Sequence, residues 1–224
     1  QDQKRGKIFT KIIKEITISA RLAGGDVSSN PRLRKAISNA KSNNMPNDKI
    51  ERAIKKGTGE LDGVIYEEIT YEGYGPGGVA IIMDVITDNK NRSVSEIRHI
   101  LTKYKGNLGE SGSVSWIFEK KGQIILSSKL NDENIVFESA LEAGAEDFET
   151  DDDIFIISTA AESLMQIRDA LESKGYDISS AEIEMVPKTL QKLEGKESDI
   201  ALELLNVLED NDDVNKLYSN FYFD

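Results

Sequence analysis

The sequence predicts an α+β fold, in which an N-terminal three-helix domain is followed by two α/β sandwich (ferredoxin-like) domains, the last inserted in the middle one. Three observations support this. Apolar residues recur at helical spacing through the first 60 positions, the pattern then alternates as in strands, and a β-α-β-β-α-β order follows. The predicted domains are 1–62, 63–119 together with 188–224, and 120–187.

Three short helices are expected at the N-terminus. In residues 4–22, apolar side chains around Ile12 recur every three or four positions and form one broad face. The second helix is expected to begin at Asn30-Pro31, because asparagine caps helices and proline suits the first turn, and the third spans residues 47–56. Three separate apolar stripes bury one another as a small bundle. The basic residues opposite the apolar face of the first helix are Lys4, Lys7, Lys11 and Lys14.

The remaining residues have the patterns of two α/β domains. In the helix expected at 131–143, Ile135 and Leu141 are predicted to face the core. The expected strands are 64–72, 79–87, 108, 114–118, 123–126, 145–148, 154–158, 176–185 and 214–221, and the expected helices are 91–104, 131–143, 161–173 and 197–208.

Composition excludes several classes of protein. The chain of 224 residues has no cysteine and one histidine, so disulfides, thiolate nucleophiles and metal sites rich in cysteine or histidine are excluded. Its longest unbroken apolar run is the five residues Val79–Met83, whereas a membrane span needs about twenty. We expect a cytoplasmic protein that does not enter a membrane.

No catalytic constellation is recognisable. The sequence lacks the glycine-rich phosphate loop and the serine nucleophile elbow, and His99 has no nucleophile that can be placed beside it. Acidic runs at 151–153 and 210–213 lack the spacing and the central glycine of a calcium loop, and the glycines of Gly73–Gly78 are typical of a turn between strands. We predict that the protein is no enzyme and binds no cofactor or metal.

Charge is distributed unevenly along the chain. The net charge of −12 combines +8 in residues 1–60, from 14 basic and 6 acidic side chains, with −20 in residues 61–224. A basic module beside an acidic body favours binding of a polyanion by the module. Two alternatives remain: the module is solvated, or it docks on an acidic protein surface such as its own body.

Lysine and arginine on helix faces bind phosphates without reading sequence. Phe9 is the one aromatic residue of the module, which favours duplex backbone or structured RNA over single-strand stacking. Possible contact tips outside the module, meaning residues at the ends of loops that could touch the nucleic acid, are Tyr74, Lys90 and Arg92. The predicted nucleic-acid contacts are Lys4, Arg5, Lys7, Lys11, Lys14, Arg21, Arg32, Arg34, Lys35, Lys41, Arg52, Lys55 and Lys56.

Several stretches of the chain resemble the YebC/PmpR family, whose mitochondrial relatives include the translational activator of cytochrome c oxidase subunit one. The stretches are KRGKIFTKIIKEIT, GGDVSSNPRLRKAISNAKSNNMPNDKIERAIKKGTGEL, YEEITYEGYGPGGVAIIMDVITDNKNRSVSEIRHI and GNLGESGSVSWIFEKKG. The match is dense to about residue 122 and looser beyond it.

The resemblance implies a three-domain fold and a cytoplasmic, DNA-binding transcriptional regulator. It also implies an alternative, a ribosome-associated translation factor that relieves stalling, for example at proline runs. It brings no catalytic residues. The expected partners are promoter DNA or ribosomal RNA, with the ribosome in the second case, and we expect a monomer. A protein-interaction module that binds no nucleic acid is the third hypothesis.

Overall fold

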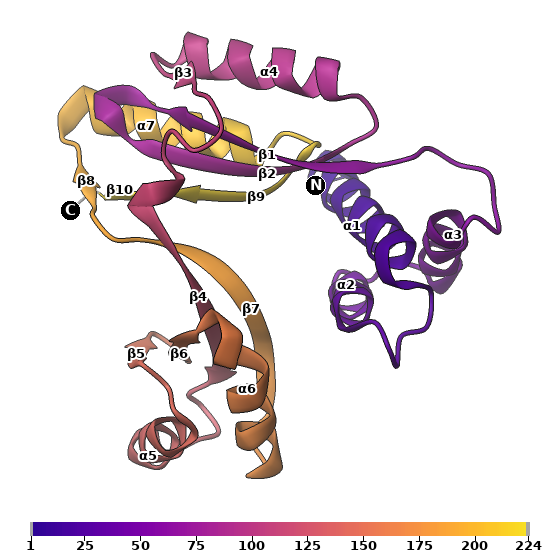
Figure 1. Cartoon of the computed structure of the whole chain (residues 1–224), viewed down its shortest axis with the longest axis vertical. Coiled ribbons are helices and arrows are strands. Elements are labelled where there is room, and N and C mark those ends of the chain that lie inside the picture. Colours follow the sequence, from indigo (N-terminus) through magenta and orange to yellow (C-terminus); the bar gives the residue numbers. More distant parts are fainter. Residues whose placement is uncertain (1, 223–224) are drawn as a thin grey trace. The chain divides into compact units, whose positions relative to one another are not determined.

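The N-terminal part of the chain forms three helices, α1 (Asp2–Ala23), α2 (Pro31–Ser42) and α3 (Asn47–Thr58) (Figure 1). Asn30 caps α2, because its side chain accepts a hydrogen bond from the backbone N–H of Leu33. Helix α3 packs so closely on α1 that a Cβ at Gly57 would lie 2.4 Å from the carbonyl oxygen of Thr17. The buried core of this bundle consists of Ile12, Ile16, Ala20, Leu33, Ala36, Ala40, Met45, Ile50 and Ala53.

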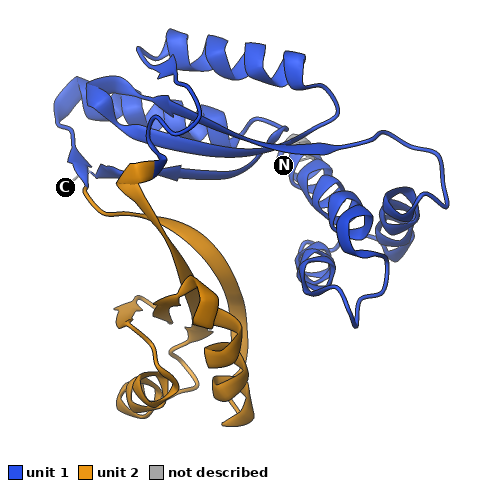
Figure 2. Ribbon diagram, in the orientation of Figure 1, with its two compact units in different colours: residues 1–115, 190–224 blue, residues 116–189 orange. Residues whose placement is uncertain are grey.

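The computed structural model describes residues 2–222, except the side chains of residues 2 and 3, and divides the chain into two units (Figure 2). Unit 1 holds the described residues up to Ser115 and from Leu190 onward, and unit 2 is Trp116–Thr189. The three helices and the first sheet both belong to unit 1, where ion pairs join them. The division into three domains stays a prediction.

The first sheet has four antiparallel strands in the order β3-β1-β2-β9. Helices α4 (Lys90–Lys103) and α7 (Gly195–Glu209) cover one face, where Ile97, Leu101 and Leu204 pack on β2 (Figure 1). The central strand β2 is buried along nearly its whole length, as its apolar sequence predicted. The strands are β1 (Glu67–Tyr74), β2 (Ala80–Thr87), β3 (Asn107–Leu108) and β9 (Val214–Ser219), with a separate short pair of β8 (Gln191–Lys192) and β10 (Phe221–Tyr222).

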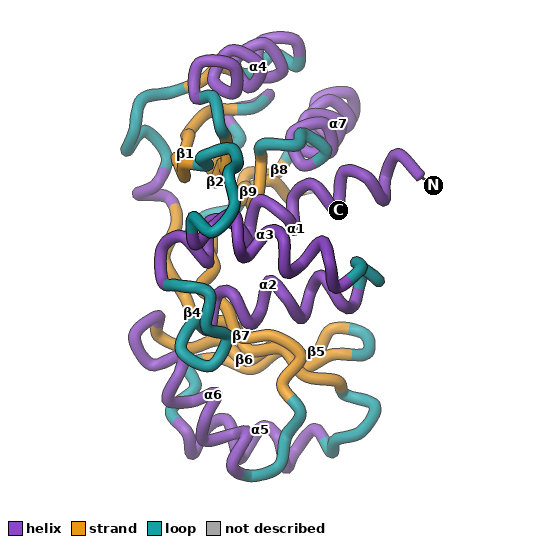
Figure 3. Tube along the Cα trace, turned by 90° about the vertical axis from the view of Figure 1, so that its right-hand side faces the viewer, coloured by secondary structure: helices purple, strands orange, loops and turns teal. Residues whose placement is uncertain are grey.

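Unit 2 is a four-stranded antiparallel sheet in the order β5-β6-β4-β7, with two helices on one face (Figure 3). The chain order is β-α-β-β-α-β, as predicted. Its core joins sheet residues such as Ile124 and Phe155 to helix residues such as Ile167. The elements are β4 (Phe118–Ser127), α5 (Glu133–Ala143), β5 (Asp147–Asp151), β6 (Ile154–Ala160), α6 (Leu164–Ser173) and β7 (Ile178–Pro187).

Two local predictions are wrong. Residues Ser115–Ile117 form a 3-10 turn, so the strand expected at 114–118 begins only at Phe118. In α5, Ile135 and Leu141 are 60% and 61% exposed, and the buried residues include the small side chains of Ser139 and Ala140. The buried face of the helix consists of Val136 together with these two small residues, so the largest apolar side chains did not mark it.

No helix in residues 2–222 is both long and apolar enough to cross a membrane.

A buried carboxylate orders the loop that leads from unit 1 toward unit 2. Glu72 is 6% exposed and accepts hydrogen bonds of 2.8 Å from the backbone N–H groups of Gly112, Val114 and Ser115. Burial alone would raise the pKa of Glu72, but these N–H donors outweigh it and hold the pKa below its ordinary value.

We predict that Glu72→Gln destabilises unit 1 by about 1–3 kcal/mol, because an amide presents one acceptor oxygen to these three donors instead of two charged ones. The free energy of unfolding in urea is the measurement. Glu67→Gln, at an exposed position of the same strand, is the matched control. Equal stability of the two variants would contradict the role given to Glu72.

Candidate nucleic-acid interface

One face of α1 contacts the acidic segment between α7 and β9. Lys7 Nζ donates to Asp210 Oδ2 at 2.6 Å, and Lys11 Nζ donates to the carbonyl oxygen of Glu209. Lys14 Nζ lies 2.5 Å from Asp213 Oδ1 and 2.8 Å from the carbonyl oxygen of Asp212. Within unit 1, the basic helices therefore dock on the acidic body through α1.

The Lys14–Asp213 pair is the buried part of this contact. The two side chains are 8% and 5% exposed. Asp213 also accepts a hydrogen bond of 2.6 Å from Ser93 Oγ and one of 3.1 Å from Arg92. Burial opposes ionisation of Asp213, but the hydrogen bonds from Lys14, Ser93 and Arg92 outweigh it and hold its pKa below the ordinary value.

Our expectation that Lys14 lies on the solvent-exposed side of α1 is wrong, because the residue is 6% exposed. Helical periodicity correctly separated it from the apolar stripe around Ile12. It did not show that a second protein surface covers the polar face at this turn.

A second set of ion pairs joins α2 to α1 and β1. Arg32 donates from Nε and Nη2 to the two carboxylate oxygens of Glu15, at 2.7 and 3.0 Å, and also binds Glu68. Asn215 of β9 donates to the same Glu15 carboxylate at 3.2 Å. The hydrogen bonds that Arg32 donates to Glu15 and Glu68 raise the pKa of Arg32 above its already high value. Arg21 binds the carbonyl oxygen of Tyr66 at 2.8 Å.

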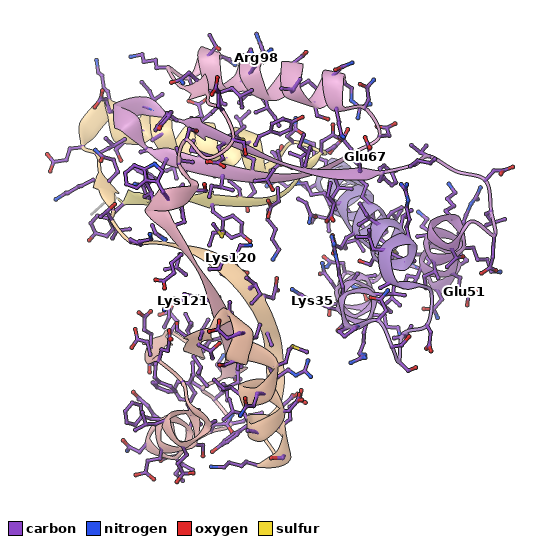
Figure 4. All side chains as sticks on the ribbon, in the orientation of Figure 1. Lys35, Glu51, Glu67, Arg98, Lys120 and Lys121 are labelled. Carbon is purple, nitrogen blue, oxygen red and sulfur yellow. The ribbon has the colours of Figure 1, made fainter. Side chains whose placement is uncertain are left out.

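Three of the cations that face solvent form a row on α3. Lys49, Arg52 and Lys55 are exposed, and their spacing of three residues makes them neighbours along the helix surface. Lys56 is half-buried and passes beside Gly63. The face is mixed in charge, since Glu51 also points outward from α3 (Figure 4).

A cationic aromatic cluster lies beside this face. The Arg5 guanidinium is 5.3 Å and the Lys49 ammonium 5.5 Å from the centre of the Phe9 ring, which is only partly buried. Our sequence prediction missed Lys49. Its spacing of three and seven residues from Arg52 and Lys56 was a signal that could have identified it.

The other predicted contacts occupy varied positions. Lys4, Lys35 and Lys41 are exposed, and Arg34 donates to the carbonyl oxygens of Val27 and Ser28. Lys35 lies on the side of the bundle opposite Glu51 (Figure 4).

The three proposed tips have intramolecular partners. The half-buried Tyr74 donates its hydroxyl to the carbonyl oxygen of Ser113 at 2.9 Å. Lys90 lies 3.3 Å from Glu67, and Arg92 pairs with Asp88 and Asp213. Arg92 thus belongs to the network that holds Lys14.

These features define an α+β protein in which a basic helical module is fixed to an acidic sheet domain. Two family models cover most of the chain: the TACO1/YebC protein N-terminal domain matches residues 1–60, and the TACO1/YebC second and third domain matches residues 66–221. The chain belongs to the TACO1/YebC family.

Curated relatives and a solved structure agree with this. Proteins of Geotalea uraniireducens and Geobacter sulfurreducens, each named "probable transcriptional regulatory protein", are 56% and 55% identical over 98% of this chain and 89% of their own. These names describe a regulator and no enzyme. The crystal structure of a conserved hypothetical protein from Aquifex aeolicus matches with a TM-score of 0.88 and 46% identity, over 99% of this chain and 91% of that one.

We predict that Lys14→Met destabilises unit 1 by about 3 kcal/mol. Removing one member of a buried ion pair leaves the other charge buried without its partner, and Arg92 and Ser93 compensate only in part. Chemical denaturation of the full chain measures the loss. Lys41→Met, at an exposed position on α2, should cause no measurable change, and an equally small effect at Lys14 would refute the burial argument.

Stability should also depend on acid through Asp213. Because its folded pKa is depressed, its contribution is complete above the unfolded pKa of about 3.9 and is lost as the pH falls through the folded value. Below about pH 4, the unfolding free energy of the native protein should therefore fall more steeply with decreasing pH than that of the Asp213→Asn variant. Parallel curves of unfolding free energy against pH would show that Asp213 titrates normally in the fold.

Proposed function

We propose that this protein regulates gene expression by binding nucleic acid through its N-terminal helices, as a DNA-binding transcriptional regulator. The observation that supports this most directly is the exposed row Lys49, Arg52 and Lys55 on α3. Arg5 and the neighbouring Phe9 extend it. The names of the relatives support the regulatory role. We place this activity in the cytoplasm, as the family resemblance implies.

Binding through this face is expected to be dominated by phosphates. Lysine and arginine side chains that project from a helix into solvent contact the sugar–phosphate backbone and add affinity without sequence information. Aspartate and glutamate within the same face, such as Glu51, limit how many phosphates it can hold. A target with a regular backbone, either duplex DNA or folded RNA, fits such a face.

The ribosome remains a second candidate target, and the charge of unit 2 favours it. Residues 116–189 contain 17 acidic and 6 basic side chains, a net charge of −11. Naked nucleic acid repels a body of this charge. A ribosome offers basic proteins beside its RNA, so a chain with one basic and one acidic part finds complementary charge for both.

We predict that Lys49→Ala/Arg52→Ala/Lys55→Ala weakens binding to a labelled DNA duplex and to an RNA hairpin. The dependence of log affinity on log salt should become shallower by roughly one for each phosphate that the variant no longer binds. Fluorescence anisotropy at several salt concentrations measures both effects.

Arg98→Ala/Lys103→Ala/Lys196→Ala is the charge-matched control for this variant. Arg98 points outward from α4 (Figure 4), and the other two residues are exposed on α4 and α7. Equal losses of affinity in the two triple variants would mean that net charge, rather than α3, determines binding, which would refute the proposed face.

Promoter DNA and the ribosome are distinguished by two measurements on the native chain. A transcriptional regulator should protect a promoter segment from nuclease in the presence of excess random DNA. A ribosome-associated factor should comigrate with ribosomal particles in a sucrose gradient at moderate salt and leave them after ribonuclease treatment. Absence of both would favour a module that binds only protein.

A further inference from the structure

We propose that Lys7 and Lys11 of α1 form a second phosphate-binding site, which the acidic segment 209–212 of the same chain occupies in the free protein. This inference rests on the proposed function, and concerns how binding at the helical module is regulated. The ligand it implies is the phosphodiester backbone of a nucleic acid.

The acidic segment places oxygen atoms against Lys7 and Lys11, as the oxygen atoms of a bound phosphate would be placed. Lys7 Nζ binds Asp210 Oδ2 at 2.6 Å and the carbonyl oxygen of Asp210 at 3.3 Å. Lys11 binds the carbonyl oxygen of Glu209. These carbonyls belong to the last turn of α7 and its C-cap, where the helix dipole is negative. The segment therefore resembles a bound anion in both charge and atom type.

The contact is weak enough to exchange. Lys7 and Asp210 have side chains that are 44% and 64% exposed, and exposed ion pairs contribute little to stability and are screened by salt. Lys14 and Asp213 differ, because their pair is buried. The exchangeable part of the interface thus ends between Lys11 and Lys14, and the buried pair keeps the module docked when the ligand replaces the segment.

Of the two lysines, Lys11 is expected to be stabilised more by a bound phosphate. Its ammonium donates a hydrogen bond to a neutral carbonyl rather than to a carboxylate. Burial lowers the pKa of Lys11, and the charges of Glu209, Asp210 and Asp212 only partly offset that effect. Lys7 and Lys11 lie one helical turn apart, about 6 Å along the axis, so one stretch of backbone can contact both.

Internal competition sets a threshold for binding. A ligand must displace Asp210 and approach the nearby carboxylates before its phosphates can bind Lys7 and Lys11. A short or weakly charged anion gains too little from the two lysines to displace the segment, whereas a long polyanion brings several phosphates close to Lys7 and Lys11 at once. The acidic segment would thereby discriminate in favour of long polyanions.

The test removes charge from the segment and keeps its shape. In Asp210→Asn/Asp212→Asn, the carboxylates of Asp210 and Asp212 are gone, while the carboxylate of Glu209 and the backbone carbonyls remain. Affinity for a labelled 20-base-pair DNA duplex or an RNA hairpin of equal length should rise roughly two- to fivefold. A double variant with the same change of charge, Glu197→Gln/Asp199→Asn, alters exposed acids about 16 Å or more away along α7 and should not change affinity.

A third variant assigns any gain to the lysines. Adding Lys7→Ala and Lys11→Ala to Asp210→Asn/Asp212→Asn should abolish the increase, and thermal unfolding of each variant verifies that it is folded. Unchanged affinity in Asp210→Asn/Asp212→Asn, an equal rise in the α7 control, or a rise that survives removal of both lysines would each overturn the inference. Absence of binding by the native chain and by all variants would instead refute the proposed function on which it rests.

Discussion

The buried ion pair between Lys14 and Asp213 is the contact on which the arrangement of unit 1 depends. It joins the first helix to the end of the sheet, and Ser93 and Arg92 complete the hydrogen bonding of the carboxylate. A charge removed from water requires such partners, because its desolvation is otherwise uncompensated. The pair fixes which side of α1 meets the sheet domain, and therefore which cations of the module remain exposed.

This contact reduces the number of basic side chains in the module that are available to a ligand. Many of the basic residues predicted to bind nucleic acid bind groups of the protein outside their own helix, among them Lys7, Lys11, Lys14, Arg21, Arg32 and Arg34. The charge of +8 counted along residues 1–60 therefore exceeds what a ligand meets in the free protein. Docking on the acidic body and binding of a polyanion were alternative hypotheses from the sequence. The structure shows docking for part of the basic residues and leaves others, such as Lys49, Arg52 and Lys55, exposed to solvent.

Sequence patterns predicted the elements well and their contacts poorly. Strong periodicity identified the three helices and the β-α-β-β-α-β order, because one buried stripe or alternating face determines each element. It failed for α5, where the buried residues are Val136 and the small residues Ser139 and Ala140. It also failed for Lys14 and Arg92, since their partner Asp213 is more than 100 residues away along the chain. Long-range ion pairing of this kind leaves no periodic signal in a single sequence.

The central claim is that the docked module meets its nucleic acid through α3. Hydrogen–deuterium exchange of the full chain, with and without a saturating RNA hairpin or DNA duplex, tests it most directly. The account predicts slower exchange in residues 47–58 and in the first turns of α1 upon binding, with unit 2 unchanged. Protection confined to unit 2, or none in α3 while the ligand is bound, would contradict it.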